Sequence, residues 1–123
     1  MPCDGGVLCV LQLISFLAST FLATHYRDIA KNNLTGSIPL SVSSLRNLDS
    51  LSLQGNQLLG PIPAGIGELQ SLQSLNVSLN RLTGGLPPTL GTLQYLSELS
   101  LFSNSIGGGI PPALGSLSSL ATL

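Results

Sequence analysis

One phrase recurs along this chain at a fixed interval of 24 residues: GNQLLGPIP begins at residue 55, LNRLTGGLP at residue 79 and SNSIGGGIP at residue 103. Whole columns of residues share the interval. They include Leu45, Leu69, Leu93 and Leu117; Leu51, Leu75, Leu99 and Leu123; Asn56, Asn80 and Asn104; Gly60, Gly84 and Gly108; and Pro63, Pro87 and Pro111. A long-period repeat predicts a solenoid, because each coil exposes an apolar face until the next coil stacks on it.

The composition fits one modest repeat domain. The chain has 123 residues, of which 43% are hydrophobic and only 4% aromatic, so its apolar material is mainly leucine at intervals. Charged residues make up 7% and the formal net charge is -1. Nucleic-acid binding requires a basic patch, so we expect no nucleic-acid partner.

Each repeat unit contains an alternating segment followed by a turn. Leu51-Ser52-Leu53 has the period of two that predicts a strand with leucines inward and serine outward. An asparagine follows each strand, and its amide can bond backbone groups that the turn leaves unpaired. Stacked coils would align these residues into an asparagine ladder of Asn32, Asn56, Asn80 and Asn104. The glycine and the Ile-Pro or Leu-Pro step that follow predict an irregular second half of the coil.

Residues 45–116 fit the pattern L-x-x-L-x-x-L-x-L-x-x-N-x-L-x-G-x-I-P-x-x-I/L-G-x, so the chain resembles the plant-type extracellular leucine-rich repeat family. The resemblance implies an α/β-type solenoid, with short parallel strands on the concave face and irregular or 3-10 segments on the convex face. We assign the solenoid to residues 29–123, divided into units 29–44 (partial), 45–68, 69–92, 93–116 and 117–123 (partial). Carried backwards, the frame puts Thr24 and Arg27 in leucine columns, so we expect the regular stack to begin near Ile29.

The same resemblance implies a function. Family members include ectodomains of receptor-like kinases, receptor-like proteins and secreted inhibitors of cell-wall-degrading enzymes, so it implies a non-catalytic module that recognises a protein or peptide, or a co-receptor ectodomain. It also implies a plant glycoprotein that is secreted or held at the plasma membrane. The chain stops at Leu123 in mid-strand, and we expect a fragment of a longer receptor. The alternative is a truncated or orphan scaffold that associates with other repeats through its uncapped end.

Residues 1–28 form an apolar amino-terminal leader, anchor or degenerate cap, and we expect it to be helical. Residues 7–24 carry no charge, which fits a cleaved signal peptide, a short membrane anchor or a cap over the first coil. Cys3 and Cys9 resemble the paired-cysteine cap of the plant family, which implies a possible disulfide. A cleaved signal would remove both cysteines, so the disulfide and the cleavage exclude each other.

The chain contains few residues of the types that catalysis or metal binding requires. It comprises one histidine, five acidic residues and two cysteines. His25 lies near Asp28 in the irregular entry segment, and Gly107-Gly108-Gly109 lacks the lysine of a phosphate loop. We therefore expect no enzyme activity, no cofactor and no metal.

Outward strand positions supply the candidate ligand contacts, because a solenoid presents them as a regular grid. They are Ser52, Gln54, Ser74, Asn76, Ser78, Leu79, Glu98, Ser100 and Phe102. Leu79 and Phe102 form either an apolar contact patch or a cover for neighbouring coils. The sequons Asn33-Leu34-Thr35 and Asn76-Val77-Ser78 make Asn33 and Asn76 glycosylation candidates, and a glycan on Asn76 would obstruct the concave sheet.

Overall fold

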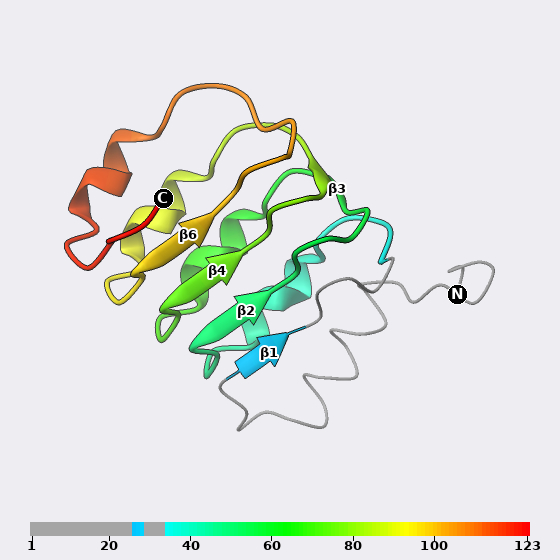
Figure 1. The fold of residues 1–123 in the computed structure, drawn as a ribbon. Helices are drawn as coiled ribbons and strands as arrows, with labels where there is room; N and C mark the ends of the chain where they lie inside the picture. Colours follow the sequence, from blue (N-terminus) through cyan, green and yellow to red (C-terminus); the bar gives the residue numbers. More distant parts are fainter. Residues whose placement is uncertain (1–25, 29–33) are drawn as a thin grey trace.

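The computed structural model describes residues 26–28 and 34–123, which build a stack of coils with their short strands side by side (Figure 1). Four strands form one parallel sheet in the order β1-β2-β4-β6. Their bounds are Tyr26–Asp28 for β1, Ser50–Ser52 for β2, Ser74–Asn76 for β4 and Glu98–Ser100 for β6. Each coil therefore adds one strand beside that of the preceding coil, which confirms the predicted parallel sheet.

The register of the sheet reproduces the interval of the sequence. Leu51 pairs with Leu75 and Leu75 with Leu99, so equivalent residues of successive coils lie side by side. Arg27 pairs with Leu51, which means that β1 continues the same register into the leucine column. The sheet thus begins at Tyr26, ahead of Ile29, where we expected the regular stack to start.

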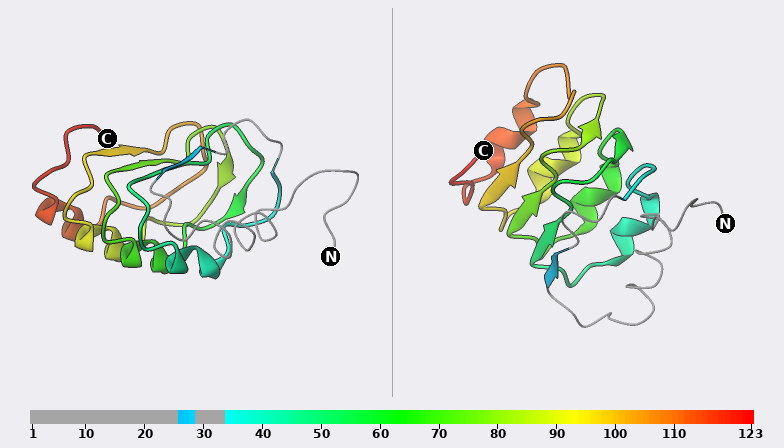
Figure 2. Two further views of the ribbon diagram at one scale, coloured as in Figure 1. Left: turned by 90° about the horizontal axis from the view of Figure 1, so that it is seen from below. Right: turned by 45° about the vertical axis from the view of Figure 1, so that its right-hand side comes forward.

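Short 3-10 helices line the side opposite the strands (Figure 2). They are η1 (Leu40–Ser44), η2 (Ala64–Glu68), η3 (Pro88–Thr92) and η4 (Pro112–Ser116). Each starts after an extended proline of the repeat, since that residue has no backbone donor and its φ is fixed. These helices confirm the 3-10 segments expected for the convex side.

A second, smaller parallel sheet joins the outer turns, where the sequence suggested irregular backbone. It consists of β3 (Leu59–Gly60) and β5 (Arg81–Leu82), and a single bridge from Ser37 to Leu59 extends it. The glycine column is needed here, because Gly60 and Gly84 have φ values of 78° and 75°, in the left-handed region.

The core fills the space between the main sheet and the 3-10 helices. It is built from the leucine columns and from one residue of each helix, such as Ile66 and Leu90, and nearly all of these side chains are buried. Burial weakens toward residue 123, where Leu101 and Leu120 are half-buried. None of the helices within the described residues has the length and hydropathy needed to span a membrane. The segment 7–24, with its three alternatives, lies outside those residues.

Candidate functional site

Three asparagines hold the strand ends of successive coils together. The backbone N–H groups of Leu34, Leu58 and Leu82 donate to the Oδ1 atoms of Asn56, Asn80 and Asn104, over 3.0, 3.1 and 2.9 Å. Each bond joins one coil to the next. The Nδ2 atoms of Asn80 and Asn104 also donate back to carbonyl oxygens of the preceding coil. Asn32 lies outside the described residues. This ladder fixes the ends of β2, β4 and β6. The outward side chains of these strands and of the residues just after them form what we call the sheet face.

The residue that precedes each ladder asparagine adopts a left-handed conformation. Gly55, Leu79 and Ser103 have φ values of 72°, 58° and 55°. For a bulky residue this conformation is strained, because Cβ approaches the following carbonyl group. Leu79 nevertheless stands there, and its backbone N–H donates to the carbonyl oxygen of Phe102 over 2.9 Å.

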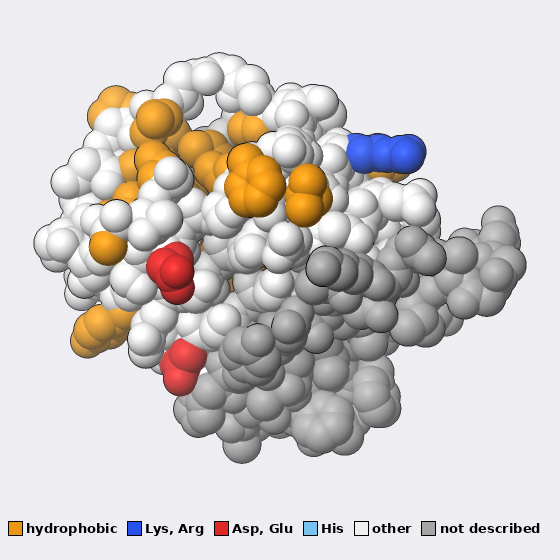
Figure 3. Space-filling model, in the orientation of Figure 1, with side chains coloured by type: hydrophobic (Ala, Val, Ile, Leu, Met, Phe, Trp, Pro, Cys, Tyr) orange, Lys and Arg blue, Asp and Glu red, His pale blue; other side chains and the backbone are white. Residues whose placement is uncertain are grey.

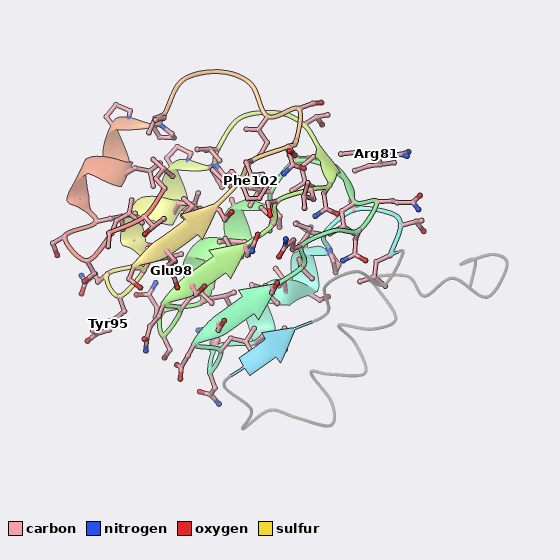
Figure 4. All side chains as sticks on the ribbon, viewed as in Figure 1. Arg81, Tyr95, Glu98 and Phe102 are labelled. Atoms are coloured by element: carbon pink, nitrogen blue, oxygen red, sulfur yellow. The ribbon has the colours of Figure 1, made fainter. Side chains whose placement is uncertain are left out.

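Leu79 and Phe102 form what we call the apolar patch. Their side chains are 42% and 59% exposed. Figure 3 shows two hydrophobic groups next to each other over the ends of β4 and β6, and Figure 4 labels Phe102 at this place. Large apolar side chains exposed together on a surface are typical of binding sites.

A polar area adjoins the apolar patch. Ser52, Ser74 and Ser100 are half-buried on the strands, and Gln54 is half-buried just after β2. Nδ2 of Asn76 donates to Oε1 of Gln54 over 3.2 Å. Nδ2 is also the atom that would carry a glycan on Asn76. The other predicted glycan acceptor, Asn33, and the predicted pair Cys3 and Cys9 lie outside the described residues.

Ser78 is not available for ligand contact, so this part of the sequence prediction was wrong. Its side chain is buried, and its hydroxyl donates to Oδ1 of Asn76 over 2.6 Å. The short side chain folds back on Asn76, while the same position in the flanking coils carries the larger Gln54 and Phe102. The alternation of inward and outward residues predicts that Ser78 points outward, but it does not show that its side chain is too short to reach the surface between Gln54 and Phe102.

Charge on the sheet face is sparse and acidic. Glu98 is exposed at the start of β6 and points out of the sheet, whereas Arg81 extends from β5 at the far edge of the molecule (Figures 3 and 4). On the helical side, Arg46 pairs with Glu68 over 2.8 Å. Across residues 26–28 and 34–123, no three His, Cys, Asp or Glu side chains gather into a metal-binding group.

Tyr95 was not among the predicted contacts, although it is 63% exposed in the turn before β6. The sequence held a signal for it, since the same column otherwise contains the small polar residues Asn47, Ser71 and Ser119. Figure 4 places Tyr95 beyond Glu98, on the side away from Phe102. Its ring is therefore separate from the apolar patch.

An apolar pocket of about 650 Å³ opens beyond β6. Its lining includes Leu86, Leu99, Leu101, Ile106 and Leu123, and Phe102 of the apolar patch also borders it. Most of these residues belong to the inward columns, so the pocket continues the solenoid core. It lies where one more coil would stack, and we distinguish it from the sheet face.

A comparison with models of known protein families gave a match to each of the three complete repeats. The model described as Leucine Rich Repeat matches residues 47–69, 71–93 and 95–117, one repeat after another. The chain belongs to the leucine-rich repeat family. The matched segments start two residues after the leucine columns at 45, 69 and 93, so they repeat with the same interval that the sequence shows.

Solved structures of plant receptors resemble this leucine-rich repeat chain. The plant peptide hormone receptor RGFR1, in complex with RGF2, has a TM-score of 0.77 and 36% identity, with 78% of this chain and 15% of that chain covered. The Arabidopsis receptor kinase HAESA, in complex with the peptide hormone IDA and the co-receptor SERK1, has a TM-score of 0.77 and 41% identity over 80% of this chain and 17% of that chain. This chain thus spans a small part of either receptor.

The fold is also shared with a different kind of protein. A plant ice-binding protein has a TM-score of 0.72 and 38% identity, with 76% of this chain and 30% of that chain covered. A comparison with curated protein sequences gave no match. The comparisons therefore support the plant extracellular leucine-rich repeat family as a whole.

Proposed function

We propose that this chain is a non-catalytic recognition module that binds a protein or peptide ligand on its sheet face. The observation that carries the proposal is the apolar patch, an aromatic and an aliphatic side chain exposed together on a backbone held by the asparagine ladder. The relatives in complex with peptide hormones support it, since they share 36% and 41% identity with this chain.

A fixed backbone favours recognition for a physical reason. Binding costs free energy when loops and side chains must become ordered, and a preorganised surface reduces that cost. On the sheet face, Asn80 and Asn104 bond two coils each, so the strand ends that carry Leu79 and Phe102 are held before any ligand arrives. Aromatic anchors on such surfaces supply much of the affinity of protein interfaces.

The proposed location is the cell exterior or cell surface, and the proposed partners include a co-receptor ectodomain. Expression of the full chain in a eukaryotic secretory system, followed by intact mass before and after glycan removal, tests the location. A product that starts near Thr24 with sugar on Asn33 would support a secreted module and remove the cysteine cap. A full-length chain without glycan and with free thiols would contradict the location.

Recognition by the sheet face is tested with a displayed library of random dodecapeptides panned against the full chain. We expect retained peptides, and we expect Ser74→Arg to abolish retention, because a large charged side chain would stand in the middle of the sheet face. Ser44→Arg, at an exposed position of η1 on the opposite side, is the matched control and should leave retention unchanged. Absence of retained peptides, or retention that survives Ser74→Arg, would contradict the proposal.

The pocket beyond β6 favours a second candidate function, a scaffold that associates with a leucine-rich coil of another repeat protein through this pocket. Besides the apolar lining, the backbone N–H groups of Leu101 and Ser103 have no acceptor among the described residues, whereas their equivalents Val77 and Leu79 donate to the next coil. Sedimentation at rising concentration tests this candidate. Association that disappears when a polar capping unit is added after Leu123 would support it, and a monomer at all concentrations would contradict it.

A further inference from the structure

We propose that the sheet face selects an extended peptide segment with a basic side chain and a large apolar side chain four residues apart. Glu98 receives the basic group and the apolar patch of Leu79 and Phe102 receives the apolar one. This inference rests on the proposed function and adds the chemistry of the ligand to it.

The first argument is that these three residues depart from the repeat. The sheet register makes Tyr26, Ser50 and Ser74 equivalent to Glu98, and the 24-residue interval makes Gln54 and Ser78 equivalent to Phe102. Gly55 takes the place of Leu79 in the preceding coil. Among the described residues, no equivalent of Glu98 is acidic, and no equivalent of Leu79 or Phe102 is apolar, so the solenoid itself requires none of the three.

The second argument is that the apolar patch is unfavourable for the free chain, because the backbone of Leu79 is strained and both side chains are exposed to water. Leu79 has a φ of 58°, in the region that glycine prefers, and its side chain is 42% exposed. Phe102 is 59% exposed beside it, and the hydrogen bond between the two backbones keeps them adjacent. An apolar side chain of a ligand would remove both from water, which is the main source of affinity at an interface core.

The third argument concerns charge. On the helical side a salt bridge joins Arg46 to Glu68. Among the described residues, the side chain of Glu98 makes no ion pair or hydrogen bond. The exposed carboxylate faces outward on the same side as the apolar patch, while Arg81 extends from the distant edge (Figure 4). Figure 3 shows a second acidic group on the same face and, in the part of the chain that it colours, basic side chains only at the distant edge, so this surface favours a cationic partner and disfavours an acidic one.

The fourth argument is spacing. Strand residues rise about 3.3 Å each, so Glu98 and Phe102 are separated by about 13 Å along the coil. In an extended ligand, residues four apart point to the same side and span the same length. Ser100 lies between the two anchors and is half-buried, so the middle outward residue of the ligand has room to approach.

Sequencing of the library peptides retained by the full chain tests this inference. We expect enrichment of lysine or arginine four positions from leucine, isoleucine, methionine or phenylalanine, in either order along the peptide. With Glu98→Lys, the preference for the basic residue should change to aspartate or glutamate. With Phe102→Ser, the affinity of a synthetic enriched peptide should fall about tenfold, the loss expected for a central aromatic anchor.

Matched control variants distinguish loss of the apolar patch from loss of any exposed leucine and from loss of folding. Leu40→Ser removes a leucine that is 77% exposed on η1, on the opposite side, and should leave the affinity of the same peptide unchanged. Leu79→Gly should lower that affinity while the chain stays folded, because glycine suits the left-handed conformation.

Four outcomes would overturn the inference. Retained peptides without the four-residue spacing, or a charge preference that Glu98→Lys does not change, would refute it while leaving the proposed function standing. Sedimentation that shows a dimer lost in Phe102→Ser would assign the patch to a second copy of the chain. Absence of any retained peptide would contradict both the inference and the proposed function.

Discussion

The side-chain Nδ2 of Asn80 donates to the carbonyl oxygen of Leu53, which lies 27 residues earlier in the preceding coil, over 2.9 Å. The same atom bonds the carbonyl oxygen of Val77 in its own coil over 3.0 Å, and Oδ1 accepts from the N–H of Leu58. One buried amide therefore satisfies backbone groups of two coils at once. This arrangement makes the solenoid sensitive to the loss of a single polar side chain.

Asn80→Ala should lower the free energy of unfolding by about 2 kcal/mol, since the N–H of Leu58 loses its acceptor and the carbonyl oxygens of Leu53 and Val77 each lose one of two asparagine donors. Urea denaturation followed by circular dichroism measures the change. Asn104→Ala is the comparison, because Asn104 makes the same kind of bonds but is half-buried, and water can replace part of its contacts. Equal losses for the two variants would contradict the role of burial.

Gly91→Ala should destabilise the chain by about 2 kcal/mol, because the new Cβ would overlap the carbonyl oxygen of Ala113 and lie 2.8 Å from its carbonyl carbon. These contacts belong to the packing of η3 against η4, where backbone leaves no room. Gly115→Ala, one coil later in the same column, meets nothing within 4 Å and should change the stability by less than about 0.5 kcal/mol. Thermal unfolding of both variants checks the contrast, and similar midpoints would refute it.

Leu79→Gly should give a more stable chain than Leu79→Ala, by about 1 kcal/mol, because alanine keeps the left-handed strain and glycine relieves it. At Ser52, in β2, the backbone is extended, so Ser52→Ala should be more stable than Ser52→Gly. Chemical denaturation of the four variants measures the two differences. If the alanine variant is more stable than the glycine variant at both positions, the backbone of Leu79 is unstrained in solution.

Glu68→Gln should change the free energy of unfolding by no more than about 0.5 kcal/mol, although Glu68 pairs with Arg46 over 2.8 Å. The side chains of Arg46 and Glu68 are 69% and 51% exposed, so water screens the pair and each side chain loses freedom when it forms. Denaturation at low and high salt measures the effect. A loss above about 1 kcal/mol that vanishes at high salt would show that the pair matters to the stack.

The sequence by itself determined the coil. Because leucine, asparagine, glycine and proline return every 24 residues, each coil has one inward face, and stacking follows from the need to bury it. The parallel strands could be predicted from these columns, and the family resemblance that the columns carry implied the 3-10 helices after Pro63 and Pro87. The small sheet of β3 and β5 could not, since it depends on how neighbouring turns meet.

Only the tertiary structure decided which outward residues stand free. Ser78 and Phe102 occupy the same column, yet Ser78 is buried under an internal hydrogen bond and Phe102 is exposed beside Leu79. Exposure depends on the heights of side chains in three adjacent coils, and on the left-handed turn at Leu79, which alternation along one strand does not record. The period of the sequence sets the direction of a side chain, whereas its neighbours across the sheet decide whether a ligand can reach it.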